Sequence, residues 1–248
     1  MVTEKTPYAI GWDVGGWNCD RNPRSRDAIV ILDPDRQVAG TPWRGNLRAL
    51  INEAQTTRDW IDGLFALCRV TQPPAGGNIF LAIDTPLAFS QAFIELTTRG
   101  RAVPGPLETS QTNPYLYRQT EQLLFTHGLR PLSAVKDLIG SQATKGMHVL
   151  AKFAPDPAGC GVWTDGAWLS AFEAYPAACK GSATIARMRA SYPALDNQDE
   201  EDALTCALLA ALFSDDQEQL WGPTAGTPIT EGWIWVPKDV IPSEQKSG

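Results

Sequence analysis

NIFLAID, residues 78–84, is a short and almost continuously apolar run that ends in an aspartate, with Thr85 and Pro86 directly behind it. Such a run, bounded by Gly and Pro residues, is typical of a strand buried on both faces. Proline ends the strand because it cannot donate a ladder hydrogen bond. The sequence therefore predicts that the carboxylate of Asp84 lies at the carboxyl end of a central strand.

The residues before this strand predict a hairpin, a third strand and a helical segment. YAIGWDV (8–14) and AIVIL (28–32) are expected to pair as a hairpin with a long polar loop, and a weaker strand is expected near 37–43. Apolar residues over 46–70 recur at helical spacing, which predicts one helix, or two with a break near 56–57. The expected element order up to Asp84 is βββαβ.

The residues after this strand predict an insertion and then a return to the sheet. The stretch 90–166 is rich in Gly, Pro, Ser and Thr and shows no clear strand, so we expect a helical insertion or lid. Beyond it the patterns predict a strand, two helices and a short strand or packing arm, in that order, at 167–176, 183–193, 200–213 and 231–237. Helical pieces within the insertion are expected near 90–98, 114–127 and 142–152.

Composition narrows the class of protein. The 248 residues carry a formal net charge of −7, and the five cysteines are odd in number and include no C-x-x-C pair. They suggest neither a disulfide framework nor a structural zinc site. No stretch reaches the roughly 18 to 20 apolar residues of a membrane span, and no signal-peptide pattern begins the chain. We expect a single domain over 1–248, soluble, cytoplasmic and unprocessed, with flexible tails at 1–6 and 240–248.

Four aspartates are expected to converge at one edge of the sheet. Asp13 lies in GWDVGG (11–16), near the end of the first strand, among glycines that let other groups approach the backbone closely. Asp84 ends the central strand, and ligands of open α/β sheets gather outside such strand ends. Asp199 and Asp202 are three residues apart at the start of a helix and share one face. Each also has a purely structural explanation, as a turn or a helix-capping acid.

These carboxylates suit a hard divalent cation. Asp and Glu oxygens, with few nitrogens nearby, are the ligands that Mg²⁺ or Mn²⁺ prefers. Two ions held this way can promote in-line phosphoryl displacement. The sequence therefore suggests a metal-dependent phosphodiesterase, with Asp13, Asp84, Asp199 and Asp202 as catalytic and metal-binding residues.

Four segments, GWDVGG, AIDTPL, FEAYPAA and D-x-x-D-A-L-T-C-A-L, resemble a bacterial and archaeal family of uncharacterised domains predicted to be ribonuclease H-like nucleases. The resemblance spans about residues 8 to 237. It implies a ribonuclease H-like α/β fold: a mixed five-stranded sheet in the order βββαβαβα, flanked by helices and carrying the helical insertion. It also implies that the first and fourth strands are neighbours, which brings Asp13 beside Asp84, and that Asp202 supplies the helix ligand.

The same resemblance extends the candidate site. Glu173, in FEAYP, is expected as a further metal ligand or as a group behind the ligands, although a structural role on an edge strand is an equal alternative. Arg118, Lys136 and Lys145 lie in the segment 99–152, where basic residues outnumber acidic ones, and are expected to contact the phosphates of a nucleic acid or nucleotide. For Arg118 the alternative is an ion pair with Glu121 or another acid. The acidic balance of the whole chain argues against tight nucleic-acid binding.

Two other readings stay open. GWDVGG also resembles the first phosphate loop of actin-like sugar kinases and ATPases, although a second such loop and a duplicated domain are not visible. The chain could instead be a non-enzymatic binding module that uses some of its nine tryptophans as an interaction surface, Trp163, Trp168, Trp233 and Trp235 among them.

Overall fold

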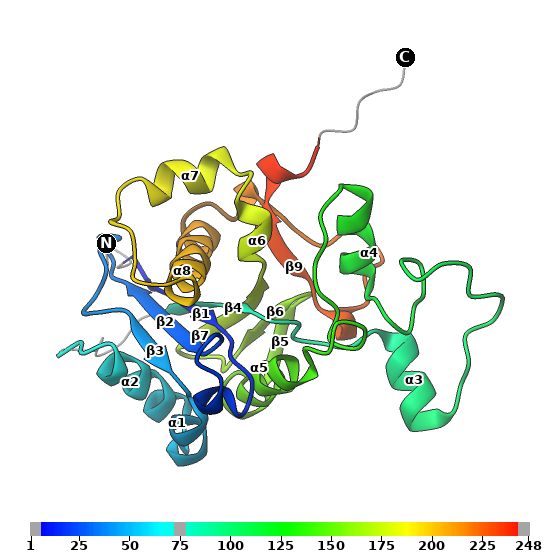
Figure 1. Ribbon diagram of the computed structural model, residues 1–248, viewed down its shortest axis with the longest axis horizontal. Helices are drawn as coiled ribbons and strands as arrows, with labels where there is room; N and C mark the ends of the chain where they lie inside the picture. The colour runs from blue at the N-terminus through cyan, green and yellow to red at the C-terminus, as the bar shows by residue number, and fades with distance from the viewer. Residues whose placement is uncertain (1–5, 72–77, 243–248) are drawn as a thin grey trace.

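The structure, a computed structural model, describes residues 6–71 and 78–242 and is built on one mixed sheet (Figure 1). Its strands follow the order β3-β2-β1-β4-β7-β6-β5, and β9 pairs with β7 and with β8. β1 pairs antiparallel with β2 and parallel with β4, which in turn pairs parallel with β7. The strands are β1 (Tyr8–Asp13), β2 (Asp27–Leu32), β3 (Trp43–Gly45), β4 (Ile79–Asp84), β5 (Asp156–Gly159), β6 (Val162–Thr164), β7 (Leu169–Ala174), β8 (Leu220–Trp221) and β9 (Ile234–Pro237).

The α/β class, the β1–β2 hairpin and the adjacency of the first and fourth strands are confirmed. The expected strand count is wrong, because the described sheet has nine strands instead of five. The hairpin of β5 and β6 falls in the stretch 90–166, where no strand was expected. The sequence did not predict it because both strands are short and β5 (DPAG) lacks the apolar alternation of a strand. The third strand begins at Trp43, beyond most of the predicted range, since Gly40 turns the chain with a φ of +71°.

Helices cover both faces of the sheet. α1 (Arg48–Glu53), α2 (Thr57–Leu67) and α5 (Gly140–Phe153) pack on the face that carries Ile10 and Trp12. α8 (Gln198–Asp216), with α6 (Pro176–Cys179) and α7 (Ala183–Arg189) beside it, packs on the opposite face (Figure 1). The predicted break near 56–57 is confirmed, because Thr56 caps α2 with its side chain and closes a capping box with Asp59.

Helix α8 lies unusually close to the sheet. A Cβ on Gly11 would come within 1.9 Å of the Ala203 carbonyl oxygen and 2.3 Å of the Ala207 nitrogen, so only glycine fits at this point of β1. Ala203 and Ala207 are fully buried there. The helix begins after Asn197, whose side chain accepts from the Glu200 N–H. The close contact brings the first turn of α8 toward the end of β1.

The remaining helices lie beside the sheet. α3 (Gln91–Arg99) and α4 (Gln119–Thr126) form a separate group at the right of the molecule in Figure 1. α5, also predicted within 90–166, places Val149, Leu150 and Phe153 in the main core. Single 3-10 turns occur at η1 (Cys19–Arg21), η2 (Gln217–Gln219), η3 (Ile229–Glu231) and η4 (Lys238–Val240). The predicted tails fall mostly on 1–5 and 243–248, outside the described residues.

Four tryptophans were considered as members of an interaction surface. Trp233 and Trp235 are buried in the core, and Trp163 and Trp168 pack against it, so the sequence-based idea of a tryptophan interaction surface finds no support in these four residues. Within the described residues, no helix is long and apolar enough to cross a membrane.

Candidate functional site

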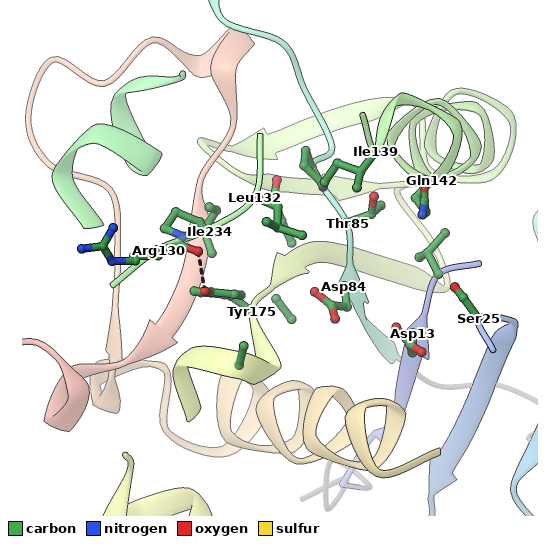
Figure 2. Close-up of a pocket in the computed structure, with 16 residues that line it drawn as sticks. Asp13, Ser25, Asp84, Thr85, Arg130, Leu132, Ile139, Gln142, Tyr175 and Ile234 are labelled. Atoms are coloured by element: carbon green, nitrogen blue, oxygen red, sulfur yellow. Dashed lines mark hydrogen bonds between the residues drawn. The ribbon is translucent and has the colours of Figure 1, made fainter. Parts of the chain in front are cut away.

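Asp13 and Asp84 are direct neighbours in the sheet. β1 and β4 run parallel in a register that pairs Asp13 with Asp84, each as the last residue of its strand. Both side chains are partly buried and project from the strand ends into the same cavity (Figure 2). The predicted placement of two carboxylates side by side at the carboxyl edge of the sheet is therefore present.

This cavity has a volume of about 440 Å³. Figure 2 shows Ser25 beside Asp13 at one end and Tyr175, Leu132 and Arg130 at the other, with Asp84 between them. Glu173, Thr85, Gln142 and several apolar side chains complete the wall. The volume lies within the range of about 300–1,000 Å³ that is typical of small-molecule sites.

The two helix aspartates are not among the described residues that line this cavity, and they have different partners. Asp199 is held by Arg44, whose Nε lies 2.7 Å from Asp199 Oδ2, and it also accepts from the Arg26 backbone N–H at 3.1 Å. Asp202 accepts one hydrogen bond, from Gln198 Nε2 at 2.9 Å. Asp199 therefore has its charge balanced by a cation, whereas Asp202 has only a neutral partner among its hydrogen bonds.

The electrostatics reveal how these acids act on one another. Burial, followed by the charges of Asp202 and Glu173, raises the pKa of Asp84 to about 8. Burial raises the pKa of Asp13 well above its usual value, and the charges of Asp84, Asp199 and Asp202 raise it further. The pKa of Asp202 is also raised, chiefly by burial. All three carboxyl groups are thus held in an environment that disfavours their charged forms.

The acids do not form a ready-made metal centre. Among residues 6–71 and 78–242, no set of three or more His, Cys, Asp or Glu side chains is grouped closely enough to hold a metal ion. What the structure brings together is the Asp13–Asp84 pair, with Asp202 acting on it through space.

Glu173 and Arg118 have a different role from the predicted ones. Arg118 is buried at 2 % exposure and grips Glu173 with two hydrogen bonds, from Nη1 to Oε2 at 2.7 Å and from Nη2 to Oε1 at 2.6 Å. It also pairs with Glu121 at 2.8 Å. The ion-pair alternative for Arg118 is the one observed, and the guanidinium is not available to a substrate phosphate. Glu173 lines the cavity, but both of its carboxylate oxygens accept hydrogen bonds from Arg118. It therefore acts on Asp84 through its negative charge and is not a free metal ligand.

Lys145 is likewise turned inward. It is fully buried and forms an ion pair with Asp27, and it also donates to the Gly15 carbonyl at 3.2 Å. The expected phosphate contact is excluded by this burial. Lys136 is the one residue of the three cations that is exposed; it pairs with Asp137 at 3.2 Å and does not line the cavity of Asp13 and Asp84.

Asp27 is a functional residue that the sequence did not single out. Its carboxylate accepts from Trp12 Nε1 at 3.1 Å, from Gly15 N at 2.9 Å and from Leu47 N at 2.7 Å. With Lys145 it fixes the glycine loop directly behind Asp13. The sequence does contain a signal for this role, because an aspartate directly precedes the buried run AIVIL. A charge at such a position needs hydrogen-bond or ion-pair partners.

Tyr175, Leu132 and Thr85 were also missed. The Tyr175 hydroxyl donates to the Arg130 carbonyl at 2.8 Å, and Leu132 is a large apolar side chain left 54 % exposed at the cavity. Thr85 is buried beside Asp84, and its hydroxyl oxygen has no hydrogen-bond partner among the described residues. Tyr175 and Thr85 stand next to predicted residues, in FEAYP and AIDTP, whereas nothing in the sequence distinguished Leu132.

Comparison of the chain with protein-family models, with curated proteins and with solved structures gives no match in any of the three. The family resemblance inferred from the motifs stays a prediction, and the function has to be argued from the site.

Proposed function

We propose that this protein hydrolyses phosphodiester bonds with the help of Mg²⁺ or Mn²⁺ and acts as a nuclease. The observation that carries the proposal is the register of β1 and β4, which places Asp13 beside Asp84 in the wall of a cavity large enough for part of a nucleotide. The strand order β3-β2-β1-β4-β7, with only β2 antiparallel to its neighbours in the centre, supports a ribonuclease H-like fold for this core.

The donor set fits a hard divalent cation in its chemistry. Asp13 and Asp84 supply two carboxylates without a cationic partner among their described hydrogen bonds. The pKa of Asp84 is raised to about 8 by burial and, after it, by the negative charges of Asp202 and Glu173. The buried Thr85 hydroxyl offers one further oxygen beside them. We assign Asp13 and Asp84 as the ligands and Asp202 as the third acid. Asp199 is a weaker candidate because Arg44 already neutralises it.

The residues of the chain have different roles in the proposed reaction. A bound Mg²⁺ or Mn²⁺ ion would supply Lewis-acid activation of water and stabilisation of the leaving oxygen. Asp13 and Asp84 present their carboxylates to the same cavity because each ends one of two paired strands. The Asp27–Lys145 pair fixes the glycine loop after Asp13, and the Arg118–Glu173 pair fixes the segment after Asp84 through the Leu87 N–H, which lies 2.9 Å from Glu173 Oε2.

The proposal is tested by nuclease assays on single- and double-stranded DNA and RNA, with Mg²⁺, Mn²⁺ or EDTA. We expect metal-dependent cleavage by the wild-type protein and its loss in Asp13→Asn and Asp84→Asn. Asp35→Asn, the same change at an exposed aspartate, is the matched control and retains activity. Folded Asp13→Asn protein that cleaves as fast as wild type would refute the assignment.

A further inference from the structure

The part of the cavity beyond Asp84 has features that the proposed chemistry does not use. Asp13 lies toward one end of the cavity, while Tyr175, Leu132 and Ile234 line the portion beyond Asp84 that extends away from Asp13 (Figure 2). Leu132 is 54 % exposed, so its apolar surface is accessible to a ligand in this portion. Metal binding requires none of these side chains, so this portion of the cavity is available to another part of a substrate.

Tyr175 is held as a fixed aromatic wall. Its hydroxyl donates to the Arg130 carbonyl at 2.8 Å, and its ring belongs to the apolar cluster of Leu124, Ile234 and Val236. The ring is only partly buried, and Figure 2 shows Tyr175 and Leu132 on the same side of Asp84. A flat apolar group that enters here would lie next to a preset ring, so little side-chain order would be lost on binding.

Two exposed arginines either line the cavity or adjoin a lining residue in the sequence. Arg130 is the one cation among the described lining residues, and its guanidinium points outward (Figure 2). Ser25, which lines the cavity beside Asp13, lies between Arg24 and Arg26 in the sequence, and Arg24 is exposed. Neither Arg130 nor Arg24 forms an ion pair within the described part of the chain. Arg130 thus supplies a cation beside the apolar portion, and Arg24 is an exposed cation next in the sequence to the lining residue Ser25.

We infer that this apolar portion binds one unpaired nucleobase next to the phosphate that lies at Asp13 and Asp84, so that the substrate is single-stranded nucleic acid or an unpaired end. The inference rests on the proposed function and narrows its substrate. A base within a duplex has to leave its stack and its pairing partner to enter such a cavity, whereas an unpaired base enters without that cost. Stacking on an aromatic side chain accepts any base, because each has a π-face.

The test is fluorescence anisotropy with short labelled oligonucleotides, without divalent ions and again with Ca²⁺. The probes are a single-stranded oligonucleotide, its blunt duplex and an abasic strand of equal length. We expect the single strand to bind tighter than the duplex and the abasic strand. Tyr175→Ala is expected to weaken single-strand binding at least about fivefold, the low end of the contribution of base stacking.

Matched variants separate the ring from general damage. Tyr175→Phe keeps the ring and is expected to bind as wild type does, while Leu132→Ala weakens binding. Leu107→Ala removes an exposed leucine that does not line the cavity and leaves binding unchanged. Thermal unfolding of each variant confirms that it is folded.

The outcomes distinguish this inference from the proposed function. Equal binding of single strand and duplex, or no effect of Tyr175→Ala in folded protein, overturns the inference even if metal-dependent cleavage is observed. Hydrolysis of a small phosphodiester such as bis(p-nitrophenyl) phosphate, with no binding of any oligonucleotide, overturns it as well. Absence of both binding and hydrolysis refutes the proposed function itself.

Discussion

The charge state of Asp84 affects the stability of the protein in the absence of metal. Its folded-state pKa of about 8 lies above the ordinary value of 3.8, so the folded chain holds a proton that the unfolded chain loses. The favourable contribution is complete below pH 4 and is lost as the pH rises toward 8. A one-unit difference in pKa between the two states corresponds to about 1.4 kcal/mol.

We therefore predict that Asp84→Asn stabilises the metal-free protein at pH 8 by about 1 kcal/mol or more and has less effect at pH 5. Urea unfolding in EDTA at the two pH values measures this difference. Asp35→Asn, at an exposed site, is the control and is expected to change neither value appreciably. A variant that is less stable than wild type at pH 8 would show that the Asp84 carboxylate is not under repulsion.

Replacement of Arg118, in contrast to that of Asp84, is predicted to lower the stability of the protein. Replacement by Met leaves the buried carboxylates of Glu121 and Glu173 without their cation, and removal of one partner of a buried ion pair typically costs about 3–5 kcal/mol. The free energy of unfolding at neutral pH is expected to fall by that order. Arg130→Met, at an exposed arginine, serves as the control, with a change of about 0.5 kcal/mol or less. A loss below about 1 kcal/mol for Arg118→Met would contradict the structural role.

The residues whose position the sequence predicted correctly differ in one respect from those whose role it predicted wrongly. Asp13 and Asp84 could be placed because each ends its own apolar strand, so local pattern sufficed. The direction of a long cationic side chain depends on partners distant in sequence: Arg118 meets Glu173 across 55 positions and Lys145 meets Asp27 across 118. No local pattern encodes such pairs, and their burial removed two of the three predicted phosphate contacts.

At the scale of elements, the contact between α8 and β1 decides the geometry of the site. Ala203 and Ala207 let the helix pack closely on β1, because their backbone atoms are the ones that a Cβ on Gly11 would meet. The long periodic segments were predictable because burial of an apolar face determines them. The short strands β5, β6 and β8 were not, since pairing with a neighbour and not their own composition makes them strands.

Gly11→Ala tests this contact. The added methyl group would overlap backbone atoms of α8, which cannot move without the helix, so we expect a loss of about 1–3 kcal/mol or more in the free energy of unfolding. The control is Gly181→Ala, at a position where a Cβ meets nothing within 4 Å. Chemical denaturation measures both. A Gly11→Ala protein as stable as the control would mean that α8 lies farther from β1 than the structure indicates.

At the scale of the whole molecule, the charge distribution has to be reconciled with a polyanionic substrate. The net charge is −7, and Arg118 and Lys145 are used in internal pairs. The cations left for phosphates near the cavity are the exposed Arg24 and Arg130. Few phosphate contacts imply weak binding with a shallow dependence on salt.

We predict that Arg24→Ala and Arg130→Ala each weaken single-strand binding and each reduce the slope of log K against log salt by about 0.7, the contribution of one phosphate contact on a single strand. Anisotropy titrations at several salt concentrations measure the slope. Lys238→Ala, an exposed cation in η4 that does not line the cavity, should leave the slope unchanged. An unchanged slope in both arginine variants would place the phosphate path elsewhere on the molecule.

The most direct test of the central claim is calorimetric titration of Mn²⁺ into the wild-type protein, Asp13→Asn, Asp84→Asn and Asp35→Asn at pH 8. Adjacent carboxylates with raised pKa values should bind the cation and release protons as they do so. We predict saturable binding by the wild-type and Asp35→Asn proteins, with proton release, and its loss in folded Asp13→Asn and Asp84→Asn. Wild-type protein that binds Mn²⁺ no better than Asp13→Asn would contradict the account.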